Sequence, residues 1–251
     1  MEKNLPNKVF YDELASDYDN MISFEKAVEN KKKLLKNFVT DEMKSAADIG
    51  CGSGVDSISL SSLGLKVTAF DPSSEMLKKA EVNSKKMKIK VEYHNYTADN
   101  IPNDFDEKFD LLTCLGNTFA NIPKEKFITS LQRCYEILKP QGLLLIQILN
   151  YDKIIFEKQR IVNITEAADK YFIRFYDFLN EQIIFNVLTF YKEKPSEYKL
   201  ISTNIYPHSS VNFKSGLKKA GFSSIQFYSN LELSAFSQEK SKDLIVLALK
   251  N

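Results

Sequence analysis

The stretch Ala46-Ala-Asp-Ile-Gly-Cys-Gly-Ser-Gly54 decides the fold of this chain. Residues 46–49 form a short apolar run that predicts a buried strand, and the glycines after it let the backbone turn sharply and approach a ligand closely. Residues 55–63 then predict a helix whose first free N–H groups face the same ligand. This order places a binding site at the carboxyl end of the strand, where open α/β sheets bind ligands.

Strands and helices alternate through the chain after this turn. Further strands are predicted at 66–70, 89–93, 109–115, 143–149, near 225 and at 244–249, and helices at 73–84, 124–138 and 211–219. Ser73 is a plausible N-cap for the first of these helices. The alternation predicts a doubly wound α/β fold with a mostly parallel seven-stranded sheet and helices on both faces.

Two segments lie outside this alternation. Residues 8–40 read as helical, and residues 1–40 are expected to form a helical cap over the ligand site. Between residues 160 and 207, alternating runs such as 172–176 and 183–191 predict an antiparallel β insertion after the fifth strand. We therefore expect one domain over residues 1–251, with residues 160–207 forming a lid over the substrate.

The charges of the chain nearly cancel. Lys and Arg number 34 and Asp and Glu 33, a formal net charge of +1, which offers no field for gathering nucleic acid or anionic membrane. The longest apolar run, 143–149, is interrupted by Gln147 and is too short to span a bilayer, and the first residues show no secretory signal. Three cysteines without metal-like spacing suit a reducing compartment. These features predict a cytoplasmic protein that acts on a small molecule, with no nucleic acid, membrane or metal partner.

Two acidic residues follow later strands at the same edge of the predicted sheet. Asp71 ends the second strand about 20 residues beyond Gly50, where a carboxylate accepts hydrogen bonds from ribose hydroxyls. Asp99 follows the third strand and is placed to meet the exocyclic amine of adenine. Val55 stands where a dinucleotide fingerprint requires a small residue, which disfavours a nicotinamide oxidoreductase. The pattern favours an adenosyl group with an amino-acid tail.

Several stretches together resemble the class I S-adenosylmethionine-dependent methyltransferases, and specifically the glycine N-methyltransferase group. The resemblance covers about residues 46–220. Of the stretches given next, the first is shared by many methyltransferases, whereas the last three are specific to fewer of them. The stretches that carry it are Asp48–Ser57, Val67-Thr68 with Asp71, Ser73, Met76-Leu-Lys78 and Ala80, then Cys114-Leu-Gly-Asn-Thr-Phe-Ala120, Asn150-Tyr-Asp152 and Tyr206-Pro-His208.

The resemblance implies a Rossmann-like methyltransferase fold that binds S-adenosylmethionine and releases S-adenosylhomocysteine. Gly50 and Gly52 would line the methionine part, and Tyr11 and Tyr18 resemble gating tyrosines that cover the cofactor. The full set of cofactor-binding residues that it implies is Tyr11, Tyr18, Asp48, Gly50, Cys51, Gly52, Asp71, Pro72, Met76, Asp99, Asn100, Leu115 and Gly116.

Candidate residues for the methyl acceptor follow the fourth and fifth strands and the insertion. Asn117 is expected to orient the substrate, and Tyr206 and His208 to act as catalytic hydrogen-bond partners or as a base. Further substrate contacts are predicted from Tyr151, Arg174 and Tyr176.

One departure from the resemblance concerns the acceptor. Leu149 stands where the glycine enzyme has an arginine that holds the substrate carboxylate, so glycine itself is a doubtful substrate. The leading prediction is N-methylation of a small amine or amino-acid-like molecule by in-line displacement. The alternatives are O-methylation of a small hydroxyl or carboxyl compound and a non-catalytic S-adenosylmethionine-binding module.

A nucleic-acid methyltransferase is a further alternative on the same fold. Such enzymes often carry an Asn/Asp-Pro-Pro-aromatic motif after the fourth strand, and here that place reads Gly116-Asn-Thr-Phe119. The balanced charge also lacks the basic surface that phosphate contacts need. Both observations disfavour this class.

Overall fold

Two β-sheets and seven α-helices make up the computed structural model, which describes residues 4–167, 169–179 and 182–251. The larger sheet has seven strands in the order β11-β12-β6-β5-β2-β3-β4. Its strands are β2 (Ser45–Ile49), β3 (Lys66–Phe70), β4 (Val91–His94), β5 (Phe109–Cys114), β6 (Leu138–Leu149), β11 (Ser223–Tyr228) and β12 (Asp243–Leu249).

The pairing in this sheet confirms the predicted doubly wound α/β fold. Strands β6, β5, β2, β3 and β4 are parallel to their neighbours, and β12 lies antiparallel between β6 and β11. Strand β2 is buried on both faces, as a central parallel strand must be. Since Ala46 and Ala47 point to opposite faces, each contributes to a different core cluster.

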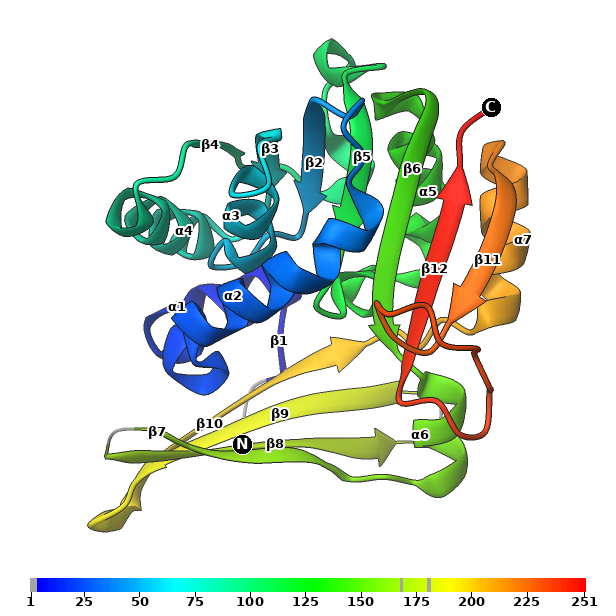
Figure 1. Cartoon of the computed structure of the whole chain (residues 1–251). Helices are drawn as coiled ribbons and strands as arrows, with labels where there is room; N and C mark the ends of the chain where they lie inside the picture. The colour runs from blue at the N-terminus through cyan, green and yellow to red at the C-terminus, as the bar shows by residue number, and fades with distance from the viewer. Residues whose placement is uncertain (1–3, 168, 180–181) are drawn as a thin grey trace.

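Helices cover both faces of the seven-stranded sheet (Figure 1). One face packs against α2 (Phe24–Leu35) and α3 (Val55–Ser61), through residues such as Leu35 and Leu60. The other packs against α5 (Lys124–Ile137) and α7 (Ser210–Ala220), through residues such as Leu131 and Leu217. Helix α4 (Ser74–Met87) begins at Ser73, whose hydroxyl accepts the Met76 N–H at 3.1 Å, as the predicted N-cap requires.

The second sheet contains the insertion that follows β6, the fifth strand of the main sheet. Its order is β1-β10-β9-β8-β7, from β1 (Asn4–Leu5), β7 (Ile161–Ala167), β8 (Lys170–Leu179), β9 (Gln182–Tyr191) and β10 (Lys194–Ile205). The pairs β7–β8, β8–β9 and β9–β10 are antiparallel, which agrees with the predicted type of insertion. Figure 1 shows this sheet lying across the end of the main sheet toward which β2 and β6 point.

Helix α1 (Asn7–Ile22) packs between the second sheet and α4. Phe10 and Leu14 of the helix share a buried cluster with Phe172 of β8 and Val187 of β9. The predicted helical segment 8–40 is broken at Ser23, whose φ of +53° ends α1 before α2 begins. Short 3-10 turns at Lys36–Phe38, Ala98–Asn100, Asn103–Phe105 and Thr118–Asn121 complete the connections.

Three local features differ from the sequence prediction. Strand β6 begins at Leu138 rather than 143, because the expected turn at 140–142 is a bulge in which Gln141 has a φ of +64°. The short helix α6 (Tyr151–Glu157) and strand β1 were not predicted. Within the described ranges, no helix combines the length and apolar character that a bilayer-spanning segment needs.

Candidate active site

The glycine-rich turn after β2 is held against the end of β3. The N–H groups of Gly50 and Cys51 both donate to the Phe70 carbonyl, at 2.7 and 3.1 Å. Gly50 has a φ of +71° and Gly52 a φ of +53°, which residues with a side chain rarely adopt. The conformation of the turn therefore requires glycine at both positions. Without side chains, the turn exposes its backbone at the carboxyl edge of the sheet.

Asp71 lies directly beside this turn. Its carboxylate accepts the Gly52 N–H at 2.9 Å and the Ser73 N–H at 2.8 Å, which fixes its orientation. Only 7% of the residue is exposed, and this burial raises the pKa of the carboxyl group to about 6. The arrangement places one ionisable, pre-oriented acceptor next to the glycine backbone.

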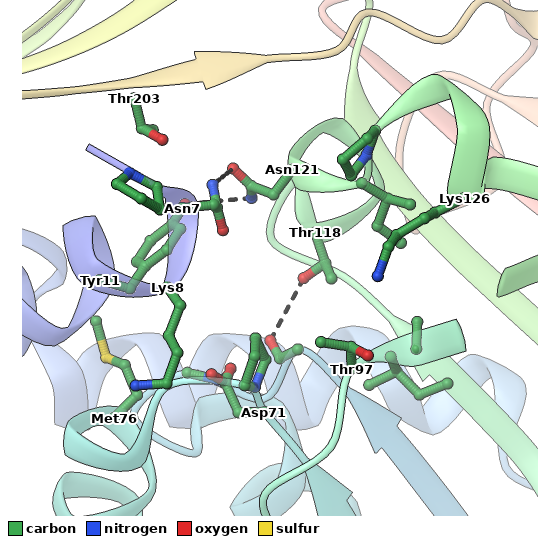
Figure 2. Close-up of a pocket in the computed structure, with 18 of the residues that line it drawn as sticks. Asn7, Lys8, Tyr11, Asp71, Met76, Thr97, Thr118, Asn121, Lys126 and Thr203 are labelled. Atoms are coloured by element: carbon green, nitrogen blue, oxygen red, sulfur yellow. Dashed lines mark hydrogen bonds between the residues drawn. The ribbon is translucent and has the colours of Figure 1, made fainter. Parts of the chain in front are cut away.

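A cavity of about 390 Å³ opens between the glycine turn, α1 and β10 (Figure 2). This volume lies within the range of small-molecule sites. The predicted cofactor or substrate residues that line the cavity are Tyr11, Tyr18, Gly50, Gly52, Asp71, Pro72, Met76, Asp99, Gly116 and Tyr206. The structure thus brings together residues from six separate parts of the sequence, as expected for a site at strand ends.

The predicted cofactor residues Asp48, Cys51, Asn100 and Leu115 do not line this cavity. Asp48 accepts hydrogen bonds from the hydroxyls of Ser57 and Thr113 inside the sheet, where burial raises its pKa to about 7. Cys51 packs into a small cluster under the turn, and Leu115 packs into the core on the α2 and α3 face. Asn100 is exposed. Membership in a sequence motif alone therefore did not distinguish these four residues from those that line the cavity.

Asp99 reaches the cavity but is paired within the protein. Its carboxylate accepts from the Lys126 ammonium at 2.8 Å, and Lys126 also lines the cavity. Desolvation acts to raise the pKa of Asp99, but the hydrogen bonds from Lys126 and Thr97 lower it below its ordinary value. The carboxylate therefore stays ionised and presents acceptor atoms near Ala98 and Ile122.

The N-terminal helix closes one side of the cavity. Asn7 donates to Asn121 Oδ1 at 2.8 Å, and Asn121 in turn donates to the hydroxyl of Tyr11 at 3.2 Å (Figure 2). Burial raises the pKa of Tyr11 and of Tyr18. These contacts join α1 to the turn after β5, so both tyrosines stand as neutral walls of the cavity.

The lining fits the cofactor that the resemblance implies. A Cβ built on Gly52 or on Gly116 meets no atom within 4 Å, so both backbones face open space rather than neighbouring protein. Asp71 supplies the charged acceptor for a diol, and Ile49, Met76 and Ala98 supply apolar surface for a planar base. This combination of a charged acceptor, apolar surface and open backbone suits an adenosyl group attached to a small polar tail.

Asn117 fixes the loop after β5 to the end of β6. Its φ is +74°, its Oδ1 accepts the Leu149 N–H at 3.0 Å, and its Nδ2 donates to the Tyr151 hydroxyl at 2.7 Å. The Tyr151 hydroxyl is 3.4 Å from that of Tyr176. The structure therefore brings these three predicted substrate residues together, but none of the three lines the cavity.

The expectation that His208 faces the pocket is wrong. The ring is 3% exposed, stacks on Phe127 with centroids 4.1 Å apart, and contacts the Ile122 carbonyl through Nε2 at 3.1 Å. This burial lowers its pKa to about 4. The imidazole is thus a neutral part of the core between α5 and α7, and it does not line the cavity as a base would have to.

The buried His208 predicts a specific pH dependence of stability. Because its pKa is about 4 when folded and 6.5 ordinarily, only the unfolded chain takes up a proton as the pH falls below 6.5. The contribution of His208 to stability is therefore lost between pH 6.5 and 4, by about 3 kcal/mol. The free energy of unfolding is measured in urea at several pH values. Its dependence on pH between 6.5 and 4 should change in His208→Gln, whereas the control His94→Gln should keep the dependence of the wild type. Equal slopes in all three proteins would contradict the assignment.

Several lining residues were not predicted from the sequence. Thr118 contacts the Gly50 carbonyl through its hydroxyl at 3.4 Å, and Thr203 and Asn204 enter from β10. Asn7 and Asn121 are 114 positions apart and meet only through the packing of α1. Single polar residues of this kind carry no local signal, since their role depends on long-range contacts.

Comparisons with known proteins agree with this geometry. Residues 46–142 match the family model described as a methyltransferase domain. A glycine N-methyltransferase from Rattus norvegicus is 37% identical over 120 residues, which is 43% of this chain and 41% of that protein. A ubiquinone biosynthesis O-methyltransferase from Hydrogenovibrio crunogenus is 28% identical over 148 residues, which is 55% of this chain and 60% of that protein.

The chain thus spans about half the length of the curated relatives that it matches. A solved S-adenosylmethionine-dependent methyltransferase from Clostridium acetobutylicum superposes with a TM-score of 0.75 at 17% identity, covering 96% of this chain and 99% of that one. The superposition establishes the fold, and the matched domain contains the glycine turn, Asp71 and Asp99. Residues 46–142 therefore match a methyltransferase domain, and the chain has the fold of the solved S-adenosylmethionine-dependent methyltransferase.

Proposed function

We propose that this protein binds S-adenosylmethionine in the cavity beside Asp71 and transfers its methyl group to the amine nitrogen of a small molecule. The observation that carries the proposal is the contact between the buried Asp71 carboxylate and the Gly52 N–H on one wall of that cavity. A pre-oriented acceptor and an open backbone at the ends of adjacent parallel strands suit an adenosyl ligand.

In this proposal, each part of the cavity has a separate task. Asp71 accepts hydrogen bonds from the ribose hydroxyls, Gly50 and Gly52 contact the methionine part, and Asp99 meets the adenine amine. Tyr11 and Tyr18 cover the site and exclude water. When bound, the cofactor supplies a methyl group on a sulfonium, a good leaving group that needs no protonation.

The chain's own contribution is then mainly position. Holding a nucleophile in line at near-attack distance provides a large part of the rate in such a displacement. Asn117 is fixed by the Leu149 N–H and the Tyr151 hydroxyl, so it acts as a rigid support for the loop over the site. The Asn7–Asn121 contact keeps α1 closed against this loop.

The titratable groups around the cavity favour an amine acceptor over a hydroxyl. A hydroxyl requires a general base, whereas a neutral amine does not. Among the described lining residues there is no histidine, and the two carboxylates, Asp71 and Asp99, are already engaged by backbone N–H groups and by Lys126. His208 is held in the core away from the cavity.

O-methylation of a small hydroxyl or carboxyl compound is the second candidate. It is favoured by the ubiquinone biosynthesis O-methyltransferases among the relatives, each of which this chain matches over only part of its length. The third candidate is a non-catalytic module that binds the cofactor. The three candidates share the cavity and differ in what the bound methyl group reaches.

A methyl-transfer screen separates these candidates. Purified protein with methyl-labelled S-adenosylmethionine is incubated with matched panels of small amines and small hydroxyl compounds, and mass spectrometry locates the methyl group. We expect N-methyl products from the amine panel. Exclusive O-methyl products would overturn the amine proposal, and measurable cofactor binding without any transfer would instead support the non-catalytic module.

A further inference from the structure

Arg174 is a cation that faces the interior of the molecule. It lies on β8 between Phe172 and Tyr176, whose exposures are 0% and 2%. Since alternate residues of a strand point to the same face, Arg174 points toward α1 and the main sheet together with these two rings. Its partner across the ladder is Val187 of β9, which is 1% exposed.

This arginine differs from the other two in the sequence by its lack of a counter-ion. Arg133 pairs with Asp106 and Glu136, and Arg160 pairs with Asp177. Within the part of the chain that the structure describes, no carboxylate lies within 4.0 Å of the Arg174 guanidinium. A half-buried charge without such a partner is costly unless a ligand supplies the opposite charge.

The groups around Arg174 are neutral and polar. Its Nε donates to the Asn163 side-chain carbonyl on the neighbouring strand β7. Desolvation lowers the pKa of the guanidinium, and the only charge partners that act on it among the described residues are the hydroxyls of Tyr18, Tyr11 and Tyr176. None of these groups carries a negative charge at neutral pH, so they cannot neutralise the arginine.

The same tyrosines connect Arg174 to the proposed active site. Tyr11 and Tyr18 line the cavity beside Asp71. Tyr176 is 3.4 Å from the hydroxyl of Tyr151, which accepts from Asn117 at 2.7 Å. Four hydroxyls and one guanidinium, from α1, α6 and β8, therefore form a polar cluster. Two of its members, Tyr11 and Tyr18, line the cofactor cavity, whereas Arg174 reaches it only through them.

We propose that Arg174 holds the carboxylate of the methyl acceptor, and that the acceptor is a small amine that carries a carboxylate. A guanidinium fork matches the two oxygens of a carboxylate, and one positive charge among neutral hydroxyls balances a single negative charge. A phosphate, with nearly two charges at neutral pH, would leave part of its charge unmatched. This inference rests on the proposed function and names the substrate class of the same site.

The first test uses the unchanged protein. Acceptors are offered in pairs that differ only in the acidic group, namely α-amino acids against their decarboxylated amines, and phosphoethanolamine against ethanolamine. We expect the carboxylate-bearing member to be methylated with the higher kcat/KM, by roughly tenfold to a hundredfold, the value of one charged hydrogen bond. Preference for the amines without an acidic group, preference for the phosphate compound alone, or no transfer to any carboxylate-bearing member would overturn the inference.

The second test changes the arginine and measures cofactor binding in parallel. Arg174→Gln should raise KM for the carboxylate-bearing acceptor roughly tenfold to a hundredfold and leave that for its decarboxylated partner unchanged, with Arg174→Lys in between. Arg160→Gln, which removes the arginine paired with Asp177, is the matched control and should change neither value. Equal KM values for wild type and Arg174→Gln would contradict the proposal.

Titration with S-adenosylhomocysteine distinguishes a failure of the proposed cofactor site from a failure of the proposed contact between Arg174 and the acceptor carboxylate. Intact binding by Arg174→Gln, with the altered KM, supports both the cofactor site and the carboxylate contact. If the protein binds S-adenosylhomocysteine but methylates only the amines without an acidic group, the role of Arg174 is overturned and the proposed function is preserved. Absence of binding in the wild type would overturn the proposed function itself. If Arg174→Gln fails to fold by circular dichroism, Arg174→Lys and the acceptor pairs decide the question.

Discussion

Replacing Asp71 by alanine is expected to weaken the binding of S-adenosylhomocysteine by about 10²- to 10⁴-fold. The proposed ribose contacts are two hydrogen bonds to a charged acceptor, each worth about 1.5–3 kcal/mol. The substitution also leaves the Gly52 and Ser73 N–H groups without the carboxylate that orients them. Both effects act at the cavity wall, so the substitution should mainly weaken the affinity for S-adenosylhomocysteine. Isothermal titration calorimetry measures this affinity.

Asp110→Ala is the matched control for this substitution. Asp110 also accepts two backbone N–H groups, from Lys44 and Ser45 at 2.9 Å each, but at the opposite end of the sheet, near the start of β2. Its loss should lower stability and leave cofactor affinity within a factor of about two, since additivity holds for distant sites. If Asp71→Ala bound the cofactor as tightly as wild type, the ribose assignment would be wrong.

Replacing Gly52 by valine is expected to abolish measurable binding of S-adenosylhomocysteine, a loss of at least about a hundredfold. A Cβ at this position meets no protein atom within 4 Å, so the side chain would project into the cavity and occupy the volume assigned to the ligand. The φ of +53° adds backbone strain of about 1–3 kcal/mol. The binding loss follows from occupied space, and the stability loss from strain.

Gly64→Val separates these two causes. Gly64 also has a positive φ, +95°, and open space around its Cβ, but it lies in the turn between α3 and β3, away from the cavity lining. Thermal unfolding should show a loss of stability in both variants, whereas calorimetry should show a loss of affinity only in Gly52→Val. Equal affinity losses in the two variants would mean that strain, and not occupied volume, explains the effect.

The sequence predicted the frame of the site because its signals are local. The turn at Gly50–Gly54 requires positive φ angles, and each strand that ends beside it is a short, mostly buried segment. Asp71 was predicted from its spacing after the glycine turn, and the structure places it on the cavity wall. Local steric rules and the chain order of a doubly wound sheet therefore suffice to locate this edge of the molecule.

The rest of the site depends on contacts that no local pattern encodes. His208 was predicted to face the pocket from its position after the insertion, yet its ring is buried against Phe127. The orientation of Arg174 follows from which face of β8 packs on α1, and alternation alone does not tell the inner face from the outer. Asn7 reaches Asn121 only after α1 packs against the second sheet and α4.

The boundaries of elements show the same division. Strand β3 was predicted with its observed ends, residues 66–70, because Gly64 lies just before it and Asp71-Pro72 follow it directly. The break at Ser23 and the bulge at Gln141 were missed, since both residues adopt positive φ without being glycine. Such conformations are stabilised by the surrounding fold, so a single sequence gives little sign of them.

Calorimetric titration of the wild-type protein with S-adenosylhomocysteine measures whether the cavity beside Asp71 binds the adenosyl cofactor. We expect one molecule bound per chain, with an affinity that weakens as the pH is lowered through about 6, where the buried Asp71 carboxyl group takes up a proton and loses its strength as an acceptor. Absence of binding heat at neutral pH, confirmed by the absence of any thermal stabilisation, would contradict the account.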